Sequence, residues 1–229
     1  IDFVCQKGQK IAVIGSTGSG KSTLVKLMNR FYDVSRGSIE INGVDIRKYN
    51  LESLRAQIGY VAQKAHMFKG SIQSNICFGK PEASVEEMVH AATVAQASDF
   101  ISTREHGYED EIAEDGTNIS GGQKQRLSIA RVILKKPSLY IYDDSFSALD
   151  FKTDATLRKA LKPEVKNAIF FVVAQRISTI MDSDMIIVLD EGQIIGMGTH
   201  AQLLKDCSVY QEIAHSQLTQ KELDDYERN

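Results

Sequence analysis

The pattern of apolar and polar positions alternates between short apolar runs and longer amphipathic segments. Apolar runs of strand length occupy residues 10–14, 58–62, 139–142, 169–173 and 185–189. Segments with apolar residues at helical spacing lie between some of them, for example residues 21–31 and 154–161. Apolar strands separated by helices are typical of a parallel sheet that is covered on both faces. The pattern therefore predicts an α/β fold with a mostly parallel sheet flanked by helices.

Two shorter segments also predict strands. Residues 39–41 are followed by Asn42-Gly43, a pair that favours a tight turn after a short strand. Residues 1–4 alternate apolar positions and predict a strand at the beginning of the chain. The first residue is Ile1 rather than Met. Because the chain would then begin inside a structural element, we expect it to be a fragment of a longer protein.

The block from residue 71 to residue 136 differs from its surroundings, because its pattern is mainly helical and contains no strand. The apolar face of one predicted helix consists of Val85, Met88, Val89 and Ala92. Glu86 and Glu87 lie outside that face. The block therefore predicts a helical subdomain that is inserted into the sheet domain.

These patterns together predict the domain organisation. We expect a core made of residues 1–70 and 137–215, with the helical subdomain at residues 71–136 between its two parts. Residues 216–229 are polar and charged, which is typical of a mobile or peripheral tail.

Composition narrows the class of protein. The chain has 229 residues, of which 42% are hydrophobic, enough for one large domain. A net charge of -3 gives no electrostatic reason to expect a nucleic acid as partner. The longest apolar run, residues 169–174, is too short to cross a bilayer. Cys5, Cys77 and Cys207 lack metal-ligand spacing, and we expect reduced thiols in a cytosolic protein.

Residues 15–22, Gly-Ser-Thr-Gly-Ser-Gly-Lys-Ser, fit the pattern G-x-x-x-x-G-K-[ST] between a predicted strand and a predicted helix. Glycines allow the backbone N–H groups to turn toward a polyphosphate. Lys21 supplies a positive charge, the hydroxyl of Ser22 can ligate Mg²⁺, and the start of the helix favours anions. An ordinary glycine-rich connection is the alternative, but it does not explain the strand–loop–helix context. We predict that this phosphate loop binds a nucleotide.

Asp143 is a candidate partner of the phosphate loop. It ends an apolar run, and a carboxylate at the carboxyl end of a strand lies beside the phosphate loop in such sheets. There it can hold Mg²⁺ through water. Apolar strands often end in Asp, so the prediction depends on the phosphate loop upstream.

A second glycine-rich helix start consists of Ser120-Gly121-Gly122-Gln123. A serine followed by glycines at the N-terminus of a helix can form an anion-binding nest. An N-cap followed by flexible glycines is the commoner explanation of such a segment. The residues themselves leave both explanations open.

Residues 119–126, Ile-Ser-Gly-Gly-Gln-Lys-Gln-Arg, are very similar to the signature motif of ATP-binding cassettes, the motor domains of ABC transporters, with Ile119 where Leu is commoner. Other segments resemble further elements of that family: residues 60–63 the Q-loop, residues 147–150 the D-loop, and residues 68–76 and 114–116 two exporter segments, the latter with Asp115 at a usually basic position. The resemblance covers essentially the whole chain. It implies a P-loop NTPase (RecA-like) fold with an inserted ABC helical subdomain.

The resemblance also implies roles for individual residues. ATP would be bound by Gly15, Ser16, Thr17, Gly18, Ser19, Gly20, Lys21, Ser22, Thr23 and Gln63. Mg²⁺ would be bound by Ser22, Gln63 and Asp143. Cassettes of this family pair head to tail, so ATP held mainly by a partner cassette would be contacted by Ser120, Gly121, Gly122 and Gln123. Gln63 would also contact the attacking water and sense the transmembrane domain.

Two positions depart from the family at its chemistry. Asp144 stands where the family usually has a Glu that acts as general base, and Gln175 stands where a His usually contacts the γ-phosphate. The shorter carboxylate is withdrawn by about an ångström, which can cost on the order of a hundredfold in rate. A neutral amide stabilises a developing anion less well than a cation. With Gln63, these are the candidate catalytic residues, and the site is expected to hold ATP and hydrolyse it slowly. Neutral drift at two tolerant positions is the alternative.

A weakened site next to an intact signature motif resembles the degenerate half of a heterodimeric exporter. This resemblance implies a non-identical second cassette and a transmembrane domain as partners, and a place on the cytoplasmic side of the cell membrane. Two other functions remain: a non-transport ATPase of the same family, and a nucleotide-binding regulatory module without useful hydrolysis. The absence of a long coiled coil and of a second cassette argues against the first, and the intact signature motif argues against the second.

Overall fold

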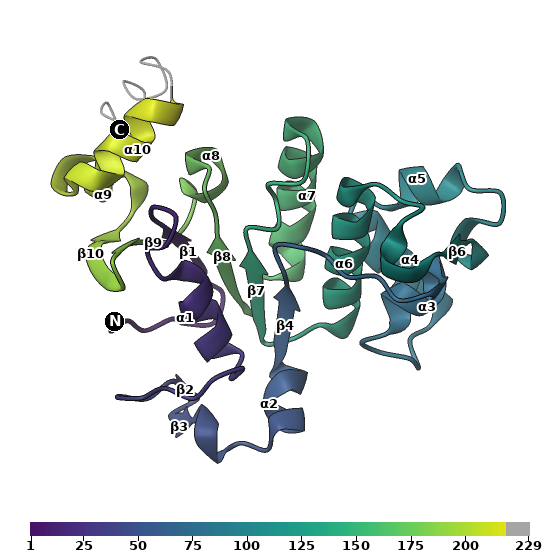
Figure 1. Cartoon of the computed structure of the whole chain (residues 1–229), viewed down its shortest axis with the longest axis horizontal. Helices are drawn as coiled ribbons and strands as arrows, with labels where there is room; N and C mark the ends of the chain where they lie inside the picture. Colours follow the sequence, from purple (N-terminus) through teal and green to yellow (C-terminus); the bar gives the residue numbers. More distant parts are fainter. Residues whose placement is uncertain (219–229) are drawn as a thin grey trace.

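The computed structural model describes residues 1–218, and its main feature is a six-stranded sheet (Figure 1). Its strands are, in spatial order, β10 (Gln193–Gly198), β9 (Met185–Asp190), β1 (Lys10–Ile14), β8 (Ile169–Val173), β7 (Leu139–Asp143) and β4 (Ile58–Val61). Neighbouring strands are parallel, except that β10 is antiparallel to β9. The predicted mostly parallel sheet is therefore confirmed, and β10 is an additional edge strand.

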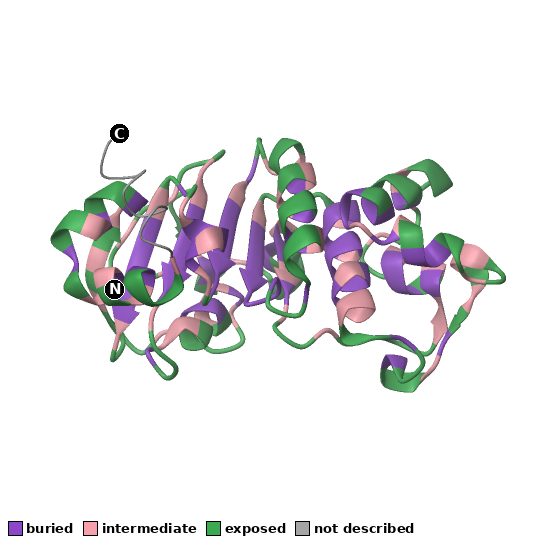
Figure 2. Cartoon of the chain, turned by 90° about the horizontal axis from the view of Figure 1, so that it is seen from above, coloured by how far each residue is buried: buried purple, intermediate pink, exposed green. Residues whose placement is uncertain are grey.

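Helices cover both faces of the sheet, because successive residues of each strand point to opposite sides. Ile11 and Val13 of β1 pack on the face that is covered by α1 (Lys21–Met28) and α2 (Leu51–Gln57). Ala12 and Ile14 pack on the other face, against the cluster that includes side chains of α7 (Phe151–Glu164), α8 (Ile177–Ile180), α9 (His200–Asp206) and α10 (Ser208–Gln217). Figure 2 shows the result: buried strands between helices whose outer surfaces are exposed.

The helical insertion lies to one side of the sheet (Figure 1). It consists of α3 (Ile72–Cys77), α4 (Val85–Val94), α5 (Ser98–Ser102) and α6 (Gly121–Lys135). The block is not free of strands, however, since β5 (Gly70–Ser71) and β6 (Glu111–Ile112) form a short antiparallel ladder. The backbone hydrogen bonds of this ladder join the first residues of the insertion to the segment before the signature motif.

The predicted apolar face of α4 is partly wrong. Met88 and Ala92 are buried as expected, but Val85 is 63% exposed and Val89 is 38% exposed. The buried row continues through Ala91 and Ala95 instead, at the spacing of consecutive helical turns. The helix is therefore rotated by about one row of side chains relative to the prediction.

Shorter elements complete the chain. They are the hairpin β2 (Glu40–Ile41) and β3 (Val44–Asp45), and the 3₁₀ turns η1 (Ile46–Lys48), η2 (Gly107–Glu109) and η3 (Glu114–Gly116). The hairpin confirms the turn at Asn42-Gly43, where both residues have positive φ. The strand predicted at residues 1–4 is wrong, because this segment pairs with no strand in the described part of the chain; Phe3 instead stacks on Phe171.

The ends of several elements differ from the predicted ends. Helix α1 ends at Met28, three residues early, and α7 extends beyond residues 154–161 at both ends. Helix α10 continues to Gln217, so the predicted tail starts within a helix, and residues 219–229 of that tail lie outside the described part. Within residues 1–218, no helix combines the length and the apolar character that a membrane span requires.

Candidate functional site

The register of the parallel strands brings four loops to one edge of the sheet. Val173 of β8 lies opposite both Val13 of β1 and Asp143 of β7. Val61 of β4 lies opposite Tyr142 of β7. Since parallel strands end at the same edge, the loops that follow β1, β7, β8 and β4 begin side by side. Ligands bind at this edge in open α/β sheets.

At the first position of the phosphate loop, the surrounding backbone leaves room only for glycine. A Cβ atom on Gly15 would lie 2.1 Å from the carbonyl oxygen of Leu189 in β9, and backbone cannot move aside easily. Gly18 and Gly20 have φ of 87° and 103°, which side chains disfavour. The N–H of Ser19 donates to the carbonyl of Ser16 at 3.2 Å and closes the loop. The chain's own packing therefore requires glycine here.

Lys21 lies folded across the phosphate loop. Its Nζ donates to the carbonyl oxygens of Gly15 and Ser16, at 2.8 and 2.6 Å, and to Oγ of Ser19 at 3.2 Å. Burial lowers the pKa of Lys21, while the charges of Asp144 and Asp143 oppose that shift. The ammonium group is thus held at the centre of the loop, facing the two carboxylates. An anionic phosphate placed there would gain a direct charge-assisted partner.

The two carboxylates after β7 are almost completely removed from solvent. Asp143 is 6% exposed and Asp144 is 8% exposed. Burial raises the pKa of both groups, and for Asp144 the neighbouring charge of Asp143 adds to the effect. The hydroxyl of Tyr60 donates to Oδ2 of Asp143 at 3.3 Å and partly offsets the shift for that residue. Two adjacent buried carboxylates repel one another, which a bound cation would relieve.

Asp144 contacts both of the other predicted catalytic residues. Nε2 of Gln175 donates to its Oδ2 at 2.7 Å, and Nε2 of Gln63 donates to the same atom at 3.1 Å. The backbone of Asp144 has φ of 47°, in the left-handed region that Asp tolerates better than longer side chains. The structure therefore brings Gln63, Asp144 and Gln175 together as the sequence predicted.

The predicted magnesium ligands suit a hard cation. Ser22 and Thr23 are exposed in the first turn of α1, directly after Lys21, while Asp143 lies at the end of the neighbouring strand. Within residues 1–218, no group of three or more His, Cys, Asp or Glu side chains could hold a metal ion. Mg²⁺ is usually held by one or two carboxylates together with waters and substrate phosphates, so a hydroxyl and a carboxylate fit an ion that arrives with a nucleotide.

The second glycine site lies elsewhere. Ser120 and Gln123 form a capping box at the start of α6, in which each side chain accepts a hydrogen bond from the other's N–H. No hydrogen bond of the described residues joins them to the phosphate loop. In Figure 1, α1 and α6 lie on opposite sides of β7 and β4. The structure therefore does not bring the two predicted nucleotide-binding segments of this chain together.

Several contacts were not predicted from the sequence, one at the site and others in the helical insertion. Tyr60 was identified only as part of the 60–63 segment, and its bond to Asp143 follows from the β4–β7 register. Phe68 and Phe78 stack at 4.3 Å between centroids, although they are 46% and 59% exposed. The guanidinium of Arg131 lies over both rings. Two exposed aromatic residues ten positions apart could have indicated this patch.

Comparisons with known proteins agree with this geometry. A family model described as ABC transporter matches residues 1–147. The chain is 44% identical over 220 residues to the uncharacterized ABC transporter ATP-binding protein Rv1273c of Mycobacterium tuberculosis (strain ATCC 25618 / H37Rv), with 95% of this chain and 38% of that protein aligned. It is 46% identical over 213 residues to the putative multidrug export ATP-binding/permease protein YgaD of Bacillus subtilis (strain 168), with 93% and 37% aligned.

A solved structure is similar as well. It is the structure of a bacterial Atm1-family ABC exporter with ATP bound, with a TM-score of 0.89 and 39% identity. The match covers 91% of this chain and 37% of that chain. The present chain thus spans less than two fifths of the length of each of these proteins.

Proposed function

The chain belongs to the ABC transporter family, and from this premise we propose that it is the ATP-binding motor domain of an exporter, on the cytoplasmic side of a membrane. The observation that carries the proposal is the convergence of the phosphate loop, Lys21 and the buried pair Asp143 and Asp144 at one sheet edge. When bound, Mg²⁺ would neutralise charge on the phosphates of ATP. Ser22 and Asp143 would hold it, with the amide of Gln63, while Lys21 would bind the phosphates directly. The core would comprise residues 1–70 and 137–215, and the subdomain residues 71–136.

We propose a transmembrane domain as one partner, and the aromatic patch of Phe68 and Phe78 supports it. Exposed aromatic pairs of this kind are typical of interaction sites. Burial lowers the pKa of Arg131 to about 10, and its Nε donates to the carbonyl of Asn75 at 2.8 Å. The rings therefore rest on a fixed cation, whose Nη1 also donates to the carbonyl oxygen of His66 at 3.4 Å, three positions after Gln63. A partner that docks here could be sensed by Gln63.

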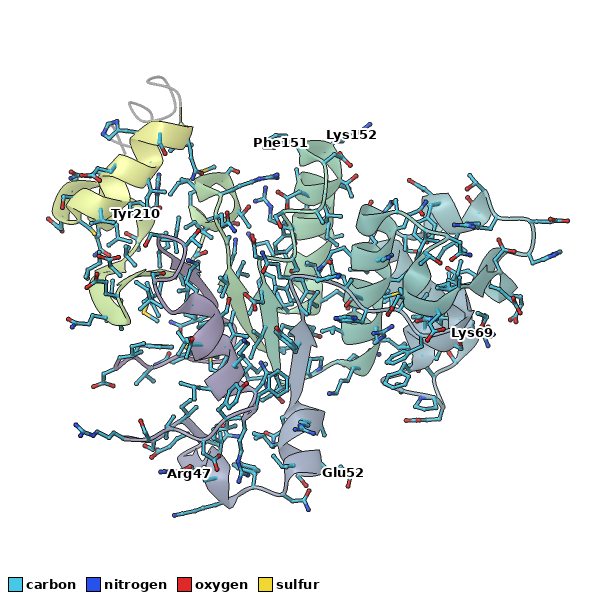
Figure 3. All side chains as sticks on the ribbon, in the orientation of Figure 1. Arg47, Glu52, Lys69, Phe151, Lys152 and Tyr210 are labelled. Atoms are coloured by element: carbon cyan, nitrogen blue, oxygen red, sulfur yellow. The ribbon has the colours of Figure 1, made fainter. Side chains whose placement is uncertain are left out.

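A second, non-identical cassette is the other proposed partner. The first glycine of the signature segment is open, since a Cβ on Gly121 would meet nothing within 4 Å. The side chain of Phe151, at the start of α7 after the 147–150 segment, is 72% exposed (Figure 3). The open helix start and the exposed ring suit a surface that another cassette covers. The ATP held by that cassette would then lie against Ser120 and Gly121.

Hydrolysis at this chain's own site is proposed to be slow. Asp144 would act as the base, but its carboxylate is one methylene shorter than Glu and accepts two amide hydrogen bonds on one oxygen. Gln175 would approach the terminal phosphate without a positive charge. The attacking water would therefore be polarised by a withdrawn carboxylate, and the developing charge would be stabilised by neutral donors.

The test compares three samples with matched nucleotide and Mg²⁺: this chain, a partner cassette, and their mixture. We expect saturable ATP binding by this chain with little turnover, and turnover in the mixture that depends on Ser120. Rapid hydrolysis by the chain alone would contradict the slow site, and absence of ATP binding would contradict the motor domain itself.

A further inference from the structure

The last residue of α10 contacts the backbone of the loop that carries Gln175. Oε1 of Gln217 accepts a hydrogen bond from the N–H of Ile177 at 2.8 Å. Its Nε2 donates to the carbonyl oxygen of Gln175 at 2.8 Å. One planar amide thus bonds to both ends of a three-residue segment. Such a contact fixes the position and the direction of this backbone at once.

The loop does not supply its own cap for the helix that follows it, although the side chain of Ile177 is buried in the core. Arg176 is the N-cap residue of the short helix α8, and its side chain makes no capping hydrogen bond. Its guanidinium instead lies 4.8 Å from the ring centroid of Phe151. A free N–H at the start of a helix needs an acceptor, which Ser, Thr, Asp or Asn at the N-cap usually provides. Gln217 supplies that acceptor from a helix 40 positions away in the chain.

Helix α10, which carries Gln217, is itself anchored to the core and to α9. Tyr210 and Ala214 are completely buried in the core of the sheet domain. The hydroxyl of Tyr210 is 2.7 Å from Nδ1 of His200 in α9. Nε2 of Gln211 also donates to the carbonyl of Leu204 at the end of α9, at 2.7 Å. Figure 1 shows α10 next to α8, and Figure 3 places Tyr210 on the same helix.

We infer that Gln217 is a positioning residue of the ATP site, which holds the Gln175 loop in register with Asp144. The side-chain bond from Gln175 to Asp144 is 2.7 Å long, so a displacement of the loop by about an ångström breaks it. The same displacement withdraws Gln175 from the terminal phosphate. The inference rests on the proposed function, because it takes Gln175 to face the γ-phosphate of ATP. It adds the C-terminal helix to the elements that build the site.

The experiment measures the dissociation constants of Mg-ATP and Mg-ADP for the whole chain by titration calorimetry. Gln217→Ala should weaken ATP binding about three- to tenfold, the effect of about one hydrogen bond, and leave ADP binding within about twofold. Gln175→Ala should have the same effect, and the double variant should show no further loss, because both act on one contact. Gln217→Glu retains the acceptor for Ile177 and should restore part of the ATP preference.

Gln211→Ala is the matched control, since it removes a similar side-chain bond from the same helix without contact to the loop. It should leave the ratio of the two constants unchanged. Hydrogen exchange supplies a readout that needs no nucleotide: the N–H of Ile177 should exchange faster in Gln217→Ala than in Gln211→Ala.

Several results would overturn the inference. One is an equal change in ATP and ADP binding by Gln217→Ala, or an unchanged ratio. Another is an additive loss in the double variant. If the unsubstituted chain binds neither nucleotide, the proposed function fails and the inference fails with it. Normal ATP binding with an unchanged ratio in Gln217→Ala removes only the role of Gln217.

Discussion

The two glycine-rich segments of this chain differ in what requires their glycines. In the phosphate loop, Gly15 is pressed against the backbone of β9, and Gly18 and Gly20 have left-handed backbones. In the signature segment, Gly121 has a helical conformation and open space where a Cβ would be. The first segment needs glycine for its own fold, whereas Gly121 gains nothing from glycine within this chain.

The two segments therefore differ in where the reason for their glycines lies. Glycine in a helix costs stability relative to Ala, so an open Gly121 is unfavourable unless something outside the chain must approach closely. The phosphate loop is complete within the chain, with Lys21 and the two carboxylates beside it. The open Gly121 is consistent with the proposed head-to-tail partner, whose ATP would approach this helix start.

Substitution of the crowded Gly15 should have the greatest effect on stability. Gly15→Ala places a Cβ 2.1 Å from the carbonyl oxygen of Leu189, and we expect a loss of about 3 kcal/mol or more in the free energy of unfolding. Gly18→Ala is the control in the same loop, since it meets no atom within 4 Å and should lose only about 1–2 kcal/mol from its left-handed backbone. Urea unfolding measures both. Equal losses would show that the contact with Leu189 does not constrain the loop.

The second effect concerns the chemistry at the same edge. Asp144→Glu combined with Gln175→His should raise the rate of ATP hydrolysis in the assembled transporter by about ten- to a hundredfold. The single variants are the controls, and each should recover part of the gain. Asp144→Glu should also reduce stability slightly, because Glu tolerates the backbone at φ of 47° less well. An unchanged rate in steady-state assays would mean that these two positions do not limit turnover.

Substitution of the open Gly121 should change stability least. Gly121→Ala should stabilise the isolated chain by about 0.4–1 kcal/mol, because the substitution reduces the freedom of the unfolded chain and meets no neighbour. Gly122→Ala should gain less, since its Cβ would lie 3.4 Å from the carbonyl oxygen of Ala148. Thermal unfolding with and without a partner cassette is the measurement. A destabilised Gly121→Ala chain would show that glycine is needed within the chain after all.

The parallel core and the main site could be predicted because their signals are local. Lys10–Ile14, Leu139–Asp143 and Ile169–Val173 are apolar runs followed directly by functional residues, so strand and site are read from the same segment. A parallel arrangement then brings their carboxyl ends together. The phosphate loop and Asp143 were predicted in this way, whereas the roles of Asp144 and Gln175 were implied by the resemblance to ATP-binding cassettes.

The other features of the fold depend on contacts between distant segments of the chain. The spacing of apolar residues carries no information about those contacts. Residues 1–4 have the alternation of a strand but pair with no other strand in the described part of the chain. The row of α4 that is buried was decided by how the insertion packs, and Val85 and Val89 turned outward. Gln217 belonged to a segment expected to be a peripheral tail, and its two bonds join positions about 40 apart.

Calorimetric titration of the folded chain with Mg-ATP measures whether residues 15–22 bind a triphosphate. We expect saturable heat at millimolar nucleotide or below, lost when Lys21→Ala removes the charge from the loop and kept in Lys48→Ala, the control at an exposed position. No heat from the unsubstituted, folded chain at millimolar Mg-ATP would contradict the claim that residues 15–22 bind a triphosphate.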